Sequence, residues 1–186
     1  MEEKTLLEHL KEFHRGDASD AYTFMGCHPA NRLTKDGYIF RVWAPHARSV
    51  RVVGSFNDWN IDSAFPMQKI TDAGVWEVHV PNAQEGDNYK YYIERPDRSY
   101  VYKSDPYGTA CEVLPSTGSV IRSLDYAWHD STYRRNRSKQ ESLHRPVNIY
   151  EVHLGSWKVK DDGSHYNYLE IADLLIPYVK EMGYTH

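Results

Sequence analysis

The chain has 186 residues, of which 40% are hydrophobic and 26% are charged, as in an average globular protein and unlike a disordered one. The net charge of −4 gives no electrostatic reason to expect nucleic acid as a partner. No apolar stretch approaches the roughly 20 residues of a membrane span, so we expect no membrane-embedded segment.

Residues 1–30 predict a short helix followed by a lead-in segment. Thr5 and Glu8 are spaced as a capping box, and Gly16 stands where the helix would end. Its apolar side would consist of Leu6, Leu7, Leu10 and Phe13. The segment opens with acidic residues and lacks the apolar run of a secretory signal, and two cysteines cannot form a disulfide framework. We therefore expect the protein to be cytoplasmic.

Residues 31–124 predict an antiparallel β-sandwich. Apolar side chains alternate in short runs, and each run is bounded by a turn signal with no helical pattern in between. The alternating runs are Tyr38–Val42, Val50–Val52, Trp76–Val80 and Tyr89–Ile93. Residues 125–146 are polar and basic without an apolar period, and this composition predicts a linker.

From residue 147 to residue 186 the pattern becomes that of an α/β protein. Val147–Leu154 is an apolar stretch that predicts a strand, and an amphipathic helix follows it. The helix would begin at a capping box formed by Asn167 and Glu170, and Pro177 should kink it. A strand followed by a helix is half of a β-α-β unit, which buries its strand only where parallel neighbours are present.

Several stretches resemble a known module. GYIFRVWAPHARSVRVVGSFNDWN (37–60), NYKYYIE (88–94) and KSDPYG (103–108) resemble the family 48 carbohydrate-binding module, an immunoglobulin-like sandwich of starch- and glycogen-active enzymes. NIYEVHLGSW (148–157) and YLEIADLLIPYVKEMGYTH (168–186) resemble the first strand and helix of the catalytic barrel of bacterial 1,4-α-glucan branching enzymes, in glycoside hydrolase family 13. AYTFMGCHPA (21–30) is similar to the segment that precedes the module in those enzymes.

The resemblance implies a mainly β fold class: an immunoglobulin-like antiparallel β-sandwich with an amino-terminal helix, followed by the incomplete β-α start of a TIM barrel. It also implies the amino-terminal region of an enzyme of glycogen biosynthesis, which cleaves an α-1,4 linkage and rejoins the segment as an α-1,6 branch. The family's catalytic carboxylates lie on later barrel strands, and Glu151, Asp161 and Asp162 have no opposing partner for retaining glycoside chemistry. We expect no catalytic residue, cofactor or metal in this chain, which should be inactive alone.

The implied partner is an α-1,4-glucan such as glycogen or a maltosaccharide. In glycogen-binding relatives of the module, the contacts come from a tryptophan in the GSFN-x-W turn, a lysine in the YK strand and an aromatic residue before the DP pair. The matching positions are Trp59, Lys90 and Tyr102, the last a smaller ring than the tryptophan of the best binders. Asn57 and Asp58 could add hydrogen bonds at the rim of the sugar.

The residues alone leave two roles open for Trp59. Fifteen tyrosines and five tryptophans exceed what a core of this size needs, and amphipathic rings suit both a sugar site and a β-sandwich. Trp59 either stacks on a glucose ring or caps the core beside Phe56 and Phe65. The alternatives to a branching-enzyme region are therefore a free-standing glycogen-binding module and a non-catalytic sandwich used for protein contact. The sequence gives no oligomeric state.

Overall fold

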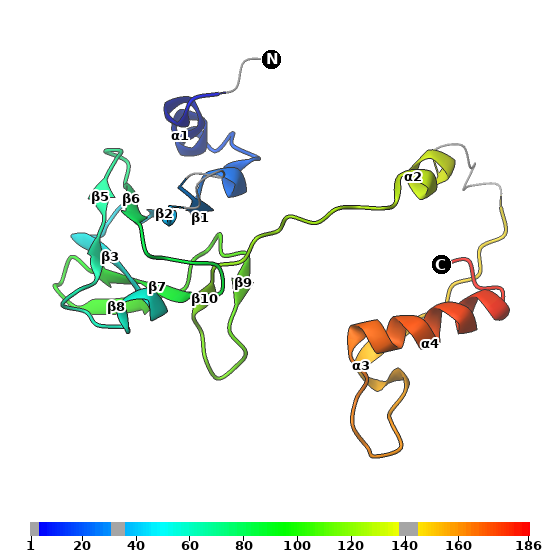
Figure 1. The fold of residues 1–186 in the computed structure, drawn as a ribbon. Helices are drawn as coiled ribbons and strands as arrows, with labels where there is room; N and C mark the ends of the chain where they lie inside the picture. Colours follow the sequence, from blue (N-terminus) through cyan, green and yellow to red (C-terminus); the bar gives the residue numbers. More distant parts are fainter. Residues whose placement is uncertain (1–3, 31–35, 138–144) are drawn as a thin grey trace. The chain divides into compact units, whose positions relative to one another are not determined.

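A computed structural model describes residues 4–30, 36–137 and 145–186 (Figure 1). The stretch 125–146, expected to be a linker, lies partly outside the described residues, and a short helix at Ser131–Arg137 forms within it. The chain divides into two compact units, residues 1–126 and 127–186, and each is described by itself. Among the described residues, no helix combines the length and the apolarity needed to cross a membrane.

The first unit begins with the predicted helix. Helix α1 (Leu6–Arg15) has Thr5 as its N-cap, with the capping box to Glu8 formed, and Gly16 in the left-handed conformation as its C-cap. A 3₁₀ turn, η1 (Ala21–Thr23), follows. Leu10 is 4% exposed and joins a small apolar cluster with Phe24, Met25 and Val75, which fixes the helix to the sandwich.

Two antiparallel sheets form the rest of this unit. The first sheet has the order β1-β2-β6-β5, in which the strands are β1 (Gly26–Pro29), β2 (Tyr38–Trp43), β6 (Val75–Val80) and β5 (Gln68–Lys69). The second has the order β4-β3-β7-β10-β9, in which the strands are β4 (Phe65–Pro66), β3 (Ser49–Gly54), β7 (Asn88–Glu94), β10 (Ser119–Val120) and β9 (Ala110–Cys111). Strand β8 (Tyr100–Lys103) pairs antiparallel with the carboxyl-terminal half of β7, Tyr91–Glu94 (Figure 1).

The alternating residues meet between the two sheets, as predicted. Phe40 from β2, Val52 from β3 and Tyr91 from β7 are each 0% exposed and belong to one core cluster. Val52 lies directly opposite Tyr91 in the ladder, so both side chains point to the same face of the second sheet. The antiparallel sandwich is therefore confirmed.

A buried carboxylate ties β7 to the segment that follows β8. Asp105 is 8% exposed, and its Oδ2 accepts hydrogen bonds from the hydroxyls of Tyr89 at 2.7 Å and Tyr91 at 2.9 Å. Its Oδ1 accepts the backbone N–H of Tyr107 at 2.8 Å, and its own N–H donates to Ser119 Oγ. Burial raises the pKa of the Asp105 carboxyl, although the hydrogen bonds from both tyrosines act in the opposite direction.

The second unit contains three helices in its described residues. They are α2 (Ser131–Arg137), α3 (Leu154–Trp157) and α4 (Tyr168–Glu181). The capping box of α4 forms as predicted, because Asn167 accepts from the N–H of Glu170 and the Glu170 carboxylate accepts from the N–H of Asn167. Ile171 is its buried residue, and the helix continues past Pro177 to Glu181.

The strand predicted at Val147–Leu154 is not formed. Residues 146–153 have no regular secondary structure, and Leu154 begins α3. The N–H of Tyr150 donates to His186 O at 2.8 Å and the N–H of His186 donates to Asn148 O at 3.1 Å, the slanted pattern of a parallel pair. A regular strand needs a longer ladder of such hydrogen bonds than this single pair provides. The prediction of a strand at Val147–Leu154 was therefore wrong.

Replacing Asp105 by alanine should destabilise the first unit by about 3 kcal/mol, because the buried Tyr89 hydroxyl loses its acceptor and Tyr91 keeps only the longer bond to Arg41 O at 3.3 Å. Denaturant unfolding followed by circular dichroism would measure the loss. The exposed Asp72 provides a matched control, and Asp72→Ala should change stability by less than about 0.5 kcal/mol. Equal effects of the two substitutions would contradict a structural role for Asp105.

The raised pKa of Asp105 predicts a pH dependence with a defined sign. A carboxyl that binds its proton more tightly in the folded state contributes stability that is present below its unfolded pKa and lost as the pH rises through its folded pKa. Relative to Asp105→Asn, the unchanged chain should therefore lose stability as the pH rises from below 3.8. Unfolding curves of both proteins between about pH 3 and pH 7 test this expectation. A stability of the unchanged chain, relative to Asp105→Asn, that rises with pH would refute it.

Candidate functional site

The outward face of the second sheet carries the candidate site. Along β7 the buried Tyr89 and Tyr91 alternate with Lys90 and Tyr92, which therefore point away from the core. Tyr92 lies opposite Tyr102 of β8 in the ladder, so these two side chains share the outward face. The register thus brings Lys90 and Tyr102, which are separated in the sequence, to one surface.

The turn after β3 presents Trp59 at the end of this sheet. The 3₁₀ turn η2 (Ser55–Asn57) follows β3, and the N–H of Trp59 donates to Gly54 O at 2.9 Å. Gly54 follows Val53, which is the cross-strand partner of Lys90. The backbone therefore anchors Trp59 beside the strand pair that carries Lys90.

Two features show that this turn is tightly constrained. A Cβ on Gly54 would lie 2.2 Å from the backbone oxygen of Asn88, so only glycine fits between β3 and β7 here. Asp58 and Trp59 have φ values of 54° and 57°, in the left-handed region that is costly for a bulky residue such as tryptophan. Such strain is concentrated at functional sites, and here it places an indole where a turn does not need one.

The exposure of Trp59 bears on its two possible roles. Phe56 and Phe65 pack against the core with their ring centroids 5.8 Å apart, as expected for residues that close the sandwich. Trp59 remains 38% exposed, and Tyr102 is 46% exposed. The core at this end is therefore closed by the two phenylalanines, and much of the indole is left at the surface.

Asn57 and Asp58 have different surroundings. Asn57 Oδ1 accepts the N–H of Gly54 at 2.9 Å, and its Nδ2 donates to Asn60 O at 2.9 Å. Its amide thus holds the turn closed. Asp58 is the left-handed residue that ends η2, and it is exposed beside Trp59.

Lys90 is held by a loop from another part of the chain. Its Nζ donates to Thr117 Oγ1 at 2.7 Å, and Thr117 lies between β9 and β10. The same loop exposes Val113 and Leu114. The ammonium group is therefore oriented at the surface and retains donor capacity for a ligand, since an ammonium group has three donors. Two aromatic rings with a fixed amine are suited to a ligand with apolar faces and hydroxyl groups.

Sequence reasoning did not identify Tyr92, Tyr100 or Thr117 at this surface. Tyr92 could have been found, because it lies two positions after Lys90 in a strand with period 2. Tyr100 and Thr117 carry no such signal, since their positions depend on the pairing of β8 and on the loop between β9 and β10.

The acids considered in the second unit have local roles or face solvent. Asp162 Oδ1 accepts hydrogen bonds from the N–H and the hydroxyl of Ser164, and these bonds lower the pKa of Asp162. Glu151 and Asp161 are exposed. His153 Nδ1 lies 2.8 Å from Ser156 Oγ, within the first turn of α3.

One cluster that the sequence did not reveal has donor atoms suited to a metal. His9, Glu12 and Asp20 place one ligand atom each within 4.8 Å of one another. The Lys4 ammonium already lies 2.7 Å from the Glu12 carboxylate, and His9 Nδ1 lies 3.4 Å from Asp20 Oδ2. The Lys4 ammonium thus already neutralises Glu12, whereas His9 Nδ1 is buried without a hydrogen-bond partner.

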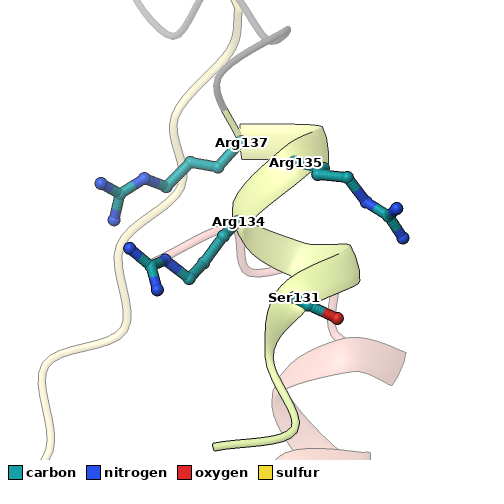
Figure 2. A pocket seen from close by; sticks show the side chains of 4 residues that line it. All are labelled: Ser131, Arg134, Arg135 and Arg137. Carbon is teal, nitrogen blue, oxygen red and sulfur yellow. The ribbon is translucent and has the colours of Figure 1, made fainter.

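Helix α2 carries an exposed group of arginines (Figure 2). Arg134 and Arg137 extend to one side of the helix, whereas Arg135 and Ser131 lie on another side. These residues line a surface hollow. They belong to a helix of seven residues with no buried member, as expected for a solvated stretch.

The importance of Asn57 for the turn can be measured. Asn57→Ala removes the acceptor of the Gly54 N–H and should lower the free energy of unfolding by about 1 kcal/mol. Asp58→Asn, which keeps a side chain tolerated in the left-handed region, should change it by less than about 0.5 kcal/mol. Urea unfolding of the two variants compares them directly, and a larger loss for Asp58→Asn would contradict this assignment.

Comparison with known proteins shows what this chain is similar to. The model of carbohydrate-binding module 48, the isoamylase N-terminal domain, matches residues 24–108. The 1,4-alpha-glucan branching enzyme GlgB of Fusobacterium nucleatum is 46% identical over 175 residues, which are 94% of this chain and 28% of that enzyme. GlgB of Geobacillus stearothermophilus is 45% identical over 94% of this chain and 27% of its own length.

Among solved structures, PulA from Klebsiella pneumoniae aligns with 59% of this chain and 10% of its own length, at 25% identity and a TM-score of 0.46. The chain spans little more than a quarter of the length of the curated relatives it matches. The family 48 match covers most of the sandwich, and the identity to branching enzymes extends over nearly the whole chain. Residues 24–108 thus match carbohydrate-binding module 48, and nearly the whole chain is similar to about a quarter of the length of 1,4-α-glucan branching enzymes.

Proposed function

We propose that the first unit binds α-1,4-glucan chains on the outward face of β3, β7 and β8, through Trp59, Lys90 and Tyr102. The observation that carries the proposal is the exposure of two aromatic residues, Trp59 at 38% and Tyr102 at 46%, on a sheet whose strand β7 carries an oriented lysine. A buried Trp59 would instead have favoured a sandwich used for protein contact.

The chemistry of a glucan fits these groups. The C–H faces of glucose are apolar and can stack on Trp59 and Tyr102, whereas its hydroxyls need donors and acceptors at the edges. Lys90 supplies a donor, and the exposed carboxylate of Asp58 supplies an acceptor. Asn57 contributes indirectly, because its amide keeps the turn closed beneath Trp59.

The expected affinity is low. A stacked ring contributes about 0.5 to 1.5 kcal/mol beyond its buried area. Two rings and a few exposed hydrogen bonds therefore suggest a dissociation constant near 1 mM, or about −4 kcal/mol. Such a site becomes effective on a polymer, where one chain offers many equivalent segments and several sites act together.

We further infer that the chain serves as the glucan-holding part of a cytoplasmic branching enzyme in glycogen biosynthesis. The complete enzyme would cleave an α-1,4 linkage and transfer the segment to form an α-1,6 branch through a covalent glycosyl intermediate. The catalytic carboxylates would come from barrel strands outside this chain, because barrel chemistry needs the ends of several strands. The sequence identity over both units supports this assignment.

Isothermal titration of the 186-residue chain with maltoheptaose tests the proposed site. Trp59→Ala should weaken binding at least about tenfold, because it removes a ring together with its buried area. Trp128→Ala, which removes an exposed indole from the second unit, is the matched control and should leave binding unchanged. No binding by the unchanged chain, or equal binding by the Trp59 variant, would refute the proposal.

A further inference from the structure

Three tyrosines on the outward face form a continuous row. The rings of Tyr92 and Tyr100 are stacked, with centroids 4.8 Å apart and planes 8° apart. The ring of Tyr92 also contacts that of Tyr102, at 4.9 Å and 50°. The Tyr92 ring therefore contacts the rings of both Tyr100 and Tyr102, and it joins the three into one row.

The strand register explains why the three rings meet. Tyr92 lies directly opposite Tyr102, and Tyr100 lies opposite Glu94, two positions along the same face. Direct and diagonal neighbours across an antiparallel pair are within reach of aromatic side chains. The contacts therefore follow from the pairing of β7 with β8, and they do not depend on a loop.

This row does not serve the core of the sandwich. Its members point outward, opposite to Tyr91 and Ile93, which pack on the core side of β7. Tyr100 is 50% exposed although it stacks on Tyr92, so the row leaves a large part of that ring in solvent. A half-exposed stacked ring on an edge strand buries little apolar surface, and stability gives little reason for it.

The row does restrict the ring of Tyr102. A tyrosine at the surface samples several rotamers, and fixing one of them on binding costs side-chain entropy. Contact with Tyr92, which is itself braced by Tyr100, removes much of that freedom before a ligand arrives. The benefit is greatest for a weak site, where a small entropic saving is a large share of the binding free energy.

We propose that Tyr92 and Tyr100 are positioning residues that hold the Tyr102 ring ready to stack on a glucosyl unit. The inference rests on the proposed function of Tyr102. Tyr100 acts through Tyr92 and does not touch the sugar. Its removal should therefore weaken short and long maltosaccharides by the same factor, whereas a residue that contacts an outlying sugar would affect the longer ligand alone.

The experiment titrates the 186-residue chain and its variants with maltotriose and with maltoheptaose. Tyr100→Ala should weaken both ligands by an equal factor, about 2- to 10-fold, the range for loss of one aromatic pair. Tyr100→Phe keeps the stacked ring and should bind as the unchanged chain does. Tyr22→Ala, an exposed tyrosine of η1, is the matched control and should have no effect.

Thermal unfolding of each variant separates positioning from loss of the fold. Tyr100→Thr preserves strand propensity, and it should reproduce the weakened binding even where the alanine variant unfolds early. Unchanged binding by Tyr100→Ala and Tyr100→Thr would overturn the inference while leaving the glucan site in place. Weakening confined to maltoheptaose, or failure of Tyr100→Phe to restore binding, would overturn it as well. Absence of binding by the unchanged chain would refute the glucan site and the inference together.

Discussion

Two tyrosine hydroxyls of β7 converge on one buried carboxylate, and this interaction fixes the register on which the candidate site depends. Tyr89 and Tyr91 both donate to Asp105, which itself belongs to the segment after β8. A slip of β7 by one residue would turn these hydroxyls to solvent and bury Lys90 in their place. The buried network therefore specifies which side of β7 faces outward, and it links the core to the surface chemistry.

The same strand serves both faces by simple alternation. Its inward residues complete the core, and its outward residues, Lys90 and Tyr92, meet partners from the β9–β10 loop and from β8. The close approach of β3 at Gly54 then sets where the turn begins and so where Trp59 stands. Lys90 and Tyr102 thus lie on paired strands, which position side chains more precisely than an independent loop does.

Local chemistry allowed much of this architecture to be predicted. The capping boxes at Thr5 and Asn167 involve residues three positions apart, so they can be read directly from the sequence, and the alternation around Tyr91 identified the core strands. The strand at Val147–Leu154 failed because its pattern describes a buried parallel strand, and that conformation depends on neighbours rather than on its own residues. The tyrosine row and Thr117 were missed for a related reason: contacts between strands are set by register, which spacing along the chain does not encode.

The geometry also suggests how the proposed glucan site would work with a smaller ring at Tyr102. Tyr102 offers less stacking area than the tryptophan implied by the best glucan-binding relatives. The favourable contribution of stacking to the binding free energy is therefore smaller. A ring that is already held in place loses less side-chain entropy on binding, so the unfavourable entropic contribution to the binding free energy is smaller as well. The two effects depend differently on ligand length. The buried stacking area increases with each sugar contacted, whereas the smaller entropy loss of Tyr102 counts once for any ligand. Pre-positioning of Tyr102 would therefore raise the affinity of the proposed site for short and long glucan segments by the same factor, and several such weak sites acting together would hold a polymer.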